Sequence, residues 1–280
     1  LSSLNSTEIE ELVNLDSADK ILRKYLPISN MREKGSFFTG QKIADNLFVN
    51  STRLISNQSI ILDPACGTGN LLIEVSRKLS VQKTLSSTLI AWNKQLIGWD
   101  IEHYFIRLAK IRLIVEAVRR GVILDCDLKI GLEILSNIQE KDALQVENHE
   151  LSGITHLLMN PPFTSSVSPK RDFWSNGKVN TAGIFIDLYI RKIPLHCELL
   201  AILPDVIRSG SRYKKLRDFI SLHLSNGMCS VYGRFNSKTD TDVFILSGIK
   251  SETEINTSVS WSSIPDAEIT LADFFDVTIG

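Results

Sequence analysis

Short apolar runs alternate with longer amphipathic segments along most of the chain. The apolar runs, which predict buried strands, span residues 59–62, 96–99, 128–130, 155–159, 199–203, 230–232 and 243–246. Helical spacing of apolar residues is found in residues 7–26, 41–54, 70–79 and 102–120. This alternation favours an α/β fold with a doubly wound, mostly parallel sheet, in which the last two strands form an antiparallel pair.

Two local signals support the predicted helix ends. Thr7 and Glu10 have the spacing of a capping box for the first helix. Gly121 follows the long helix at the position where a left-handed glycine commonly ends a helix.

The composition fits a reduced cytoplasmic protein. Of the 280 residues, 43% are hydrophobic, which is enough for one large domain with or without small appendages. Neither a signal peptide nor an 18-residue apolar span is present, so we expect neither secretion nor membrane insertion. The chain begins with Leu1 rather than Met, which suggests a fragment. The cysteines lack metal-ligand spacing, so we expect no structural zinc; they are Cys66, Cys126, Cys197 and Cys229.

The charge balance argues mildly against tight, autonomous binding of nucleic acid. With 31 Lys and Arg against 32 Asp and Glu, the net charge is −1, whereas nucleic-acid binders usually carry a basic excess. Basic residues do cluster locally, and a solvated helix face explains such a cluster equally well. They are Arg208, Arg212, Lys214, Lys215 and Arg217 in one segment, and Lys170, Arg171 and Lys178 in another.

Residues 159–163 (Met-Asn-Pro-Pro-Phe) end a predicted strand in a sharp turn. The two prolines remove backbone donors and stop the strand, leaving an amide, bare carbonyls and an aromatic ring at its carboxyl end. Open α/β sheets bind their ligands at that edge. Asn160 and the Pro161 carbonyl can accept hydrogen bonds from an amino group, while Phe163 stacks on a flat partner. A plain strand-ending turn with a packed Phe is the alternative interpretation.

A loop of small residues follows the first strand at residues 63–70 (Asp-Pro-Ala-Cys-Gly-Thr-Gly-Asn). Gly67 and Gly69 allow a tight bend and close approach to a ligand. The loop lacks the third glycine of a dinucleotide fingerprint and the Gly-Lys-Ser/Thr of a phosphate loop. Asp100 follows the second strand, where a carboxylate commonly accepts ribose hydroxyls.

The two motifs resemble those of adenine methyltransferases that use S-adenosylmethionine. Their cofactor loop typically reads Asp-Pro-Ala-Cys-Gly-Thr/Ser-Gly, and Asn-Pro-Pro-Phe is similar to their catalytic motif. Residues 32–40 resemble the element that precedes the cofactor loop in DNA adenine methyltransferases of the gamma motif order, with Gly40 in place of the usual Pro. The resemblance implies a Rossmann-like methyltransferase fold with S-adenosylmethionine as cofactor.

The resemblance also implies a set of cofactor contacts. In the family, an acid or amide after a strand-ending glycine meets the cofactor's adenine. Leu132 occupies that position after Gly131, so we prefer the neighbouring Glu133 to Asp127. The expected contacts are Phe37, Phe38, Thr39, Asp63, Pro64, Ala65, Gly67, Gly69, Asn70, Asp100, Ile101 and Glu133.

The implied reaction is methyl transfer to the N6 amino group of adenine in DNA, without a metal. The expected catalytic residues are Asn160, Pro161, Pro162 and Phe163, and Phe235 is the candidate for a second ring stacked on the flipped base. Methyltransferases of RNA bases or of protein glutamine, and a non-catalytic S-adenosylmethionine-binding subunit, are the alternatives.

The motif order is similar to that of type I restriction modification subunits and of fused restriction–modification enzymes. It predicts an N-terminal helical segment in residues 1–34, a catalytic domain in residues 35–250, and a linker in residues 251–280. In such enzymes the linker leads to a target-recognition domain. We therefore expect DNA as the partner, read by a recognition domain or specificity subunit outside this chain, and possible further subunits of the restriction system.

Overall fold

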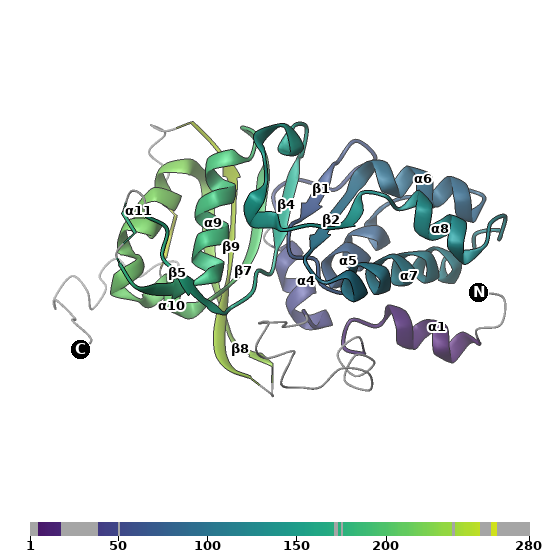
Figure 1. Cartoon of the computed structure of the whole chain (residues 1–280), viewed down its shortest axis with the longest axis horizontal. Coiled ribbons are helices and arrows are strands. Elements are labelled where there is room, and N and C mark those ends of the chain that lie inside the picture. Colours follow the sequence, from purple (N-terminus) through teal and green to yellow (C-terminus); the bar gives the residue numbers. More distant parts are fainter. Residues whose placement is uncertain are drawn as a thin grey trace.

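The computed structural model describes residues 5–17, 39–49, 51–170, 173–174, 176–236, 239–252 and 259–261 (Figure 1). In this part of the chain a seven-stranded sheet has the strand order β3-β2-β1-β4-β7-β9-β8. Strands β3, β2, β1, β4 and β7 are parallel, and β9 runs antiparallel to both β7 and β8. The predicted sheet, mostly parallel with a late antiparallel pair, is confirmed. The strands are β1 Ile61–Asp63, β2 Leu96–Asp100, β3 Ile138–Glu140, β4 His156–Met159, β7 Glu198–Pro204, β8 Leu224–Asn236 and β9 Thr239–Lys250.

Two layers of helices enclose the sheet, because successive strand residues face opposite sides. Leu200 and Ile202 of β7 belong to the core shared with α4, α5, α6 and α7. Leu199 and Ala201 belong to the core shared with α9 and α11. The helices are α1 Ser6–Val13, α4 Gln41–Val49, α5 Asn70–Lys78, α6 Leu85–Gln95, α7 His103–Arg119, α8 Leu128–Ile134, α9 Thr181–Lys192, α10 Asp205–Ser209 and α11 Lys214–His223.

Smaller elements fill the connections. Strands β5 Ser165–Val167 and β6 Lys178–Asn180 form a separate antiparallel pair after β4. The described residues also form the short 3-10 helices η1 Ala143–Gln145, η2 Asn148–Leu151 and η3 Ser211–Tyr213. Among the described residues, no helix is long and apolar enough to cross a membrane.

The first helix is shorter than predicted and begins with a different cap. The capping box is formed by Asn5 and Glu8, not by Thr7 and Glu10, and α1 ends at Val13. Residues 18–38 lie outside the described part of the chain. Helix α1 packs along α7, as Figure 1 shows, so its apolar face is covered by the same helix that follows β2.

The predicted strand at residues 128–130 is wrong. These residues begin α8, whose N-cap is Asp127, with its side chain accepting a hydrogen bond from Ile130 N at 2.8 Å. The third strand of the sheet is instead β3, in which Ile138 is buried while Gln139 and Glu140 are exposed. The predicted helix at residues 41–54 ends at Val49, and residues 85–95, between the first two strands, form α6.

Candidate active site

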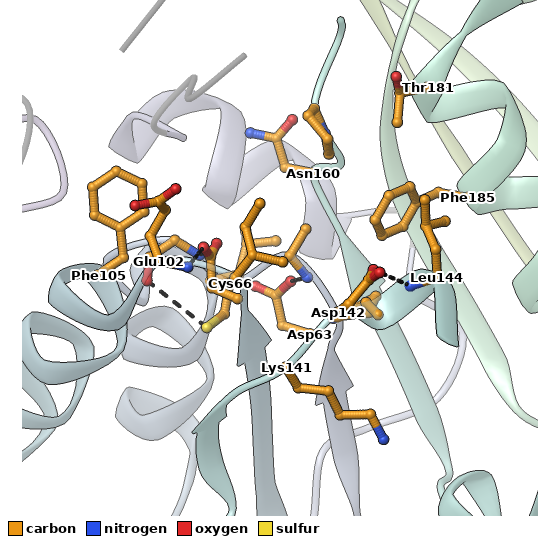
Figure 2. A pocket seen from close by; sticks show the side chains of 18 of the residues that line it. Asp63, Cys66, Glu102, Phe105, Lys141, Asp142, Leu144, Asn160, Thr181 and Phe185 are labelled. Atoms are coloured by element: carbon orange, nitrogen blue, oxygen red, sulfur yellow. Dashed lines mark hydrogen bonds between the residues drawn. The ribbon is translucent and has the colours of Figure 1, made fainter. Parts of the chain in front are cut away.

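The carboxyl ends of β1, β2, β3 and β4 surround one cavity of about 470 Å³ (Figure 2). The strand order reverses between β1 and β4, which is where doubly wound sheets open a ligand crevice. Most of the predicted site residues line this cavity: Thr39, Asp63, Pro64, Ala65, Gly67, Asn70, Asp100, Ile101, Asn160 and Pro162. Pro161 is buried between the last two, and Phe37 and Phe38 lie outside the described residues.

The loop between β1 and α5 is folded tightly against β2. Gly67 and Gly69 have positive φ angles of 53° and 83°. A Cβ on Gly69 would lie 3.0 Å from the Cβ of Ala109, so α7 and this loop approach each other as closely as glycine permits. Gly67 N donates to Asp100 Oδ2 at 2.9 Å, which fixes the loop against the end of β2.

Besides Glu102, three carboxylates reach the cavity, one from the end of each of three neighbouring strands. Burial raises the pKa of the Asp63 carboxyl to about 8, and the nearby charge of Asp100 adds to the rise, although Ala65 N donates to Asp63. Burial likewise raises the pKa of Asp100, opposed by backbone hydrogen bonds from Glu102 and Gly67. The third carboxylate belongs to Asp142, which follows β3 and accepts from Leu144 N at 2.9 Å. This edge of the sheet is therefore suited to cationic or hydrogen-bond-donating groups.

Asn160 is joined to the segment before α4. Its Nδ2 donates to Thr39 Oγ1 at 3.0 Å. The carbonyl of Thr39 in turn accepts from Asn70 Nδ2 at 2.5 Å, and Arg112 donates to both Asn70 Oδ1 and the carbonyl of Thr68. A continuous chain of hydrogen bonds thus connects the buried Arg112 of α7 to the amide of Asn160.

The two predicted stacking rings contact each other. Phe163, in the turn after β4, and Phe235, near the end of β8, have ring centroids 5.8 Å apart at an interplanar angle of 82°. Phe235 is buried, with 6% of its surface exposed. The sheet thus brings together rings that are 72 positions apart in sequence, in edge-to-face packing.

Glu133 does not lie where the sequence suggested. It is exposed on α8 and does not line the cavity, because residues 128–134 form a helix rather than a strand. The position after the third strand belongs to Asp142, which sequence reasoning missed. Three apolar residues of the cavity wall, Phe105, Leu144 and Phe185, were also missed. The available signal was Asp142 itself, an acid that follows the buried Ile138 by four residues.

Among the described residues, no group of three His, Cys, Asp or Glu side chains could hold a metal ion.

This fold and this cavity define a doubly wound α/β protein with a cavity at the switch point of the sheet. The sequence model of the N-6 DNA methylase family matches residues 18–184. The chain belongs to the N-6 DNA methylase family.

Solved structures share the fold at low sequence identity. The modification subunit assigned to a type I restriction enzyme of Vibrio vulnificus YJ016 has a TM-score of 0.61 and 18% identity, over 89% of this chain and 51% of that one. A protein from Listeria monocytogenes, assigned to the class I S-adenosylmethionine-dependent methyltransferases, has a TM-score of 0.56 and 16% identity, over 92% and 74%. The methyltransferase subunit of a type I restriction–modification system from Streptococcus thermophilus has a TM-score of 0.52 and 14% identity, over 90% and 52%.

The chain spans about half the length of the two type I subunits, 51% and 52%. No curated protein sequence matches it.

Proposed function

We propose that this chain carries the methyl-transfer site of a restriction–modification system and methylates the N6 amino group of adenine in DNA. The observation that carries the proposal is that Asn160, in an Asn-Pro-Pro-Phe turn, shares one cavity with the loop of residues 63–70 and with Asp100. The Asn160 amide, which can hold an amino nitrogen, therefore lies in the same cavity as residues that suit a nucleoside cofactor. Membership in the N-6 DNA methylase family supports the same reaction.

The residues at the cavity fit S-adenosylmethionine. The cavity volume is in the range of small-ligand sites. Asp63 would pair with the cationic methionine end, whose positive charge would favour the ionised form of this carboxyl over the protonated form that burial favours. Asp100 would accept hydrogen bonds from the ribose hydroxyls, and Asp142 would accept one from the amino group of the adenine. Ile101, Phe105 and Leu144 supply apolar walls for a flat ring. The cofactor supplies an electrophilic methyl group on a positively charged sulfur, so the protein needs no metal to activate it.

Asn160 and the Pro161 carbonyl would act on the acceptor nitrogen. The lone pair of an adenine amino group is delocalised into the ring, which makes it a weak nucleophile. Two acceptors that each take one N–H draw this nitrogen toward tetrahedral geometry and aim its lone pair across the cavity. Alignment of the reacting groups contributes about 7 kcal/mol or more in favourable cases. Phe163 would stack on the extruded base, and Phe235 would support the stack from β8.

We propose that target reading lies outside the catalytic unit. Residues 35–250 would form that unit, residues 1–34 an N-terminal helical segment, and residues 251–280 a linker to a target-recognition domain or specificity subunit. The type I subunits that share the fold support this organisation. The net charge of −1 supports it too, because it provides little general attraction for DNA.

A transfer assay with S-adenosylmethionine labelled on the methyl group tests the proposal. The complete protein with its system's subunits is offered DNA, RNA and protein separately, and we expect label in DNA as N6-methyladenine. Asn160→Ala should abolish transfer and leave cofactor affinity within about twofold, because Asn160 acts on the acceptor. The matched control is Asn148→Ala, at an exposed asparagine of η2.

Other outcomes identify the rival functions. Label only in RNA or only in protein would mean a different acceptor for the same turn. Cofactor binding without transfer to any acceptor would mean a non-catalytic subunit.

A further inference from the structure

A second cavity of about 610 Å³ lies on the other side of the Asn-Pro-Pro-Phe turn. Phe163 lines this cavity, whereas its neighbour Pro162 lines the first one. Thr164 and Ser165 line both. The remaining walls come from β6 and from the connection between β7 and α11, and they consist of Lys178, Val179, Asn180, Val206, Ser209, Gly210, Ser211, Arg212 and Tyr213. We refer to this space as the cationic cavity.

In the described part of the chain, the two cations of its wall have no acidic partner, because no carboxylate lies within salt-bridge distance of Lys178 or Arg212. Both side chains are exposed, and Arg212 Nη2 donates to the backbone carbonyl of Asn176 at 2.7 Å. The positive charge on this wall is therefore available to an external anion.

Other basic residues of the same segment are already used within the fold. Arg208 is paired with Asp205, with Nε and Oδ1 2.6 Å apart. Arg217 donates to the carbonyls of Ile207 and Gly210 at 2.9 and 2.8 Å. The three arginines of the basic cluster thus divide into two that are bonded within the fold, Arg208 and Arg217, and one, Arg212, that lines a cavity.

Gly210 shapes the wall between these cations and α11. A Cβ there would lie 2.5 Å from the carbonyl oxygen of Val206, so the chain passes close to α10 at this point. Ser209 and Ser211 line the same wall, and Ser209 Oγ donates to the carbonyl of Asp205 at 3.1 Å.

We propose that the cationic cavity binds a backbone phosphate of the DNA strand that carries the target adenine, with Arg212 and Lys178 as the charged contacts. The inference rests on the proposed function, because it assigns the phosphate to the same strand whose base meets Asn160. The two cavities adjoin each other at Thr164, Ser165 and the ring of Phe163. One nucleotide could therefore place its base at the Asn-Pro-Pro-Phe turn and its phosphate in the cationic cavity. Phosphate contacts of this kind fix the position of a strand and carry no sequence information.

The salt dependence of DNA binding tests the cavity. The complete protein with its subunits is titrated with a 30-base-pair duplex at several salt concentrations. Each phosphate contact contributes a slope of about −0.9 to the plot of log K against log salt. We expect Arg212→Gln and Lys178→Gln each to make the slope less negative by about 1, and the double variant by about 2. Arg212→Lys should retain the wild-type slope. The matched control Lys129→Gln changes an exposed lysine of α8, at the opposite end of the sheet, and should leave the slope unchanged.

A second measurement locates the phosphate. Once the methylated adenine of host DNA is known, single phosphates around it are replaced by neutral methylphosphonates. Replacing the phosphate that occupies the cationic cavity should raise the wild-type KM for DNA roughly tenfold. The same replacement should leave the KM of the double variant unchanged, because that variant has already lost the contact.

The outcomes separate this inference from the proposed function. Methyl transfer to DNA by the wild type, with an unchanged slope in the double variant, overturns the phosphate site and leaves the function intact. The phosphate site is also overturned if the slope changes but every methylphosphonate that weakens DNA binding by the wild type weakens binding by the double variant as well. Transfer only to RNA or protein overturns both.

Discussion

The amide of Asn160 donates from Nδ2 to the hydroxyl of Thr39 at 3.0 Å, although 121 positions separate the two residues in the sequence. Thr39 is buried, and its carbonyl accepts from Asn70 of the loop after β1. The contact orients the Asn160 amide so that Nδ2, rather than Oδ1, faces Thr39. One residue therefore holds both the loop proposed for the cofactor and the amide proposed for the acceptor.

We expect the hydroxyl of Thr39 to affect turnover. Thr39→Val removes the acceptor for Asn160 and should lower kcat about fivefold, equivalent to the loss of one hydrogen bond of ~1 kcal/mol. Thr39→Ser keeps the hydroxyl and should restore most of the rate. Steady-state kinetics and calorimetry of cofactor binding check both variants. A large loss of cofactor affinity with an unchanged kcat would mean that the hydroxyl acts on the cofactor alone.

We expect Asp142, not Glu133, to contribute to cofactor binding. Asp142→Ala removes a carboxylate from the cavity wall and should weaken binding of S-adenosylmethionine by about 1–3 kcal/mol, because a polar group of the ligand would lose its partner. Glu133→Ala is the matched control, since this side chain is exposed on α8. Isothermal calorimetry distinguishes the two. If both variants lose the same affinity for S-adenosylmethionine, or only Glu133→Ala loses it, the assignment of this contact to Asp142 would be wrong.

The raised pKa of Asp63 should appear in the pH dependence of stability. Its carboxyl has a pKa of about 8 in the fold against 3.8 ordinarily. Between these values the folded protein holds a proton that the unfolded chain has released, so this group's contribution to the free energy of unfolding falls as the pH rises from about 4 to 8. Asp63→Asn cannot ionise. Between pH 5 and pH 8, the free energy of unfolding of Asp63→Asn should therefore rise by about 1–3 kcal/mol relative to that of the wild type.

Urea unfolding of the cofactor-free protein at several pH values measures this difference. Asp45→Asn, at an exposed position of α4, serves as the control and should show the wild-type profile. Parallel profiles for wild type and Asp63→Asn would contradict the shift.

Arg112 should be required for stability. Its guanidinium is fully buried, and burial lowers its pKa to about 9. It donates to the carbonyls of Leu12 and Thr68, each at 2.7 Å. Arg112→Met would leave these acceptors without a donor and should cost about 2–4 kcal/mol of unfolding free energy. Arg107→Met, on the exposed side of the same helix, should change it by less than about 0.5 kcal/mol. A small effect of Arg112→Met in thermal or urea unfolding would show that water replaces the arginine.

The sequence predicted those parts of the site in which the local residues allow few backbone conformations. Two prolines after a strand forbid its continuation at residue 161, and Gly67 and Gly69 mark a turn wherever they occur in such a pattern. Asp142 was missed because its strand, β3, buries only Ile138 and therefore gives no apolar run. The more apolar residues 128–130 predict that strand instead, although Asp127 marks a helix start and Gly131 is buried in α8. The contact between Thr39 and Asn160 depends on tertiary packing, which no local pattern encodes.

Thr164 and Ser165 form the partition between the two cavities, so each ligand would touch the same short stretch of backbone. Ligands that share a wall are thermodynamically linked: if one shifts this segment, the affinity for the other changes, and by reciprocity the factor is the same in both directions. The order in which methyl donor and DNA arrive is then irrelevant to their combined affinity. A change in the partition alone, such as Thr164→Val, would alter the cooperativity between the two ligands even though its hydroxyl is bonded within the protein, to Thr181.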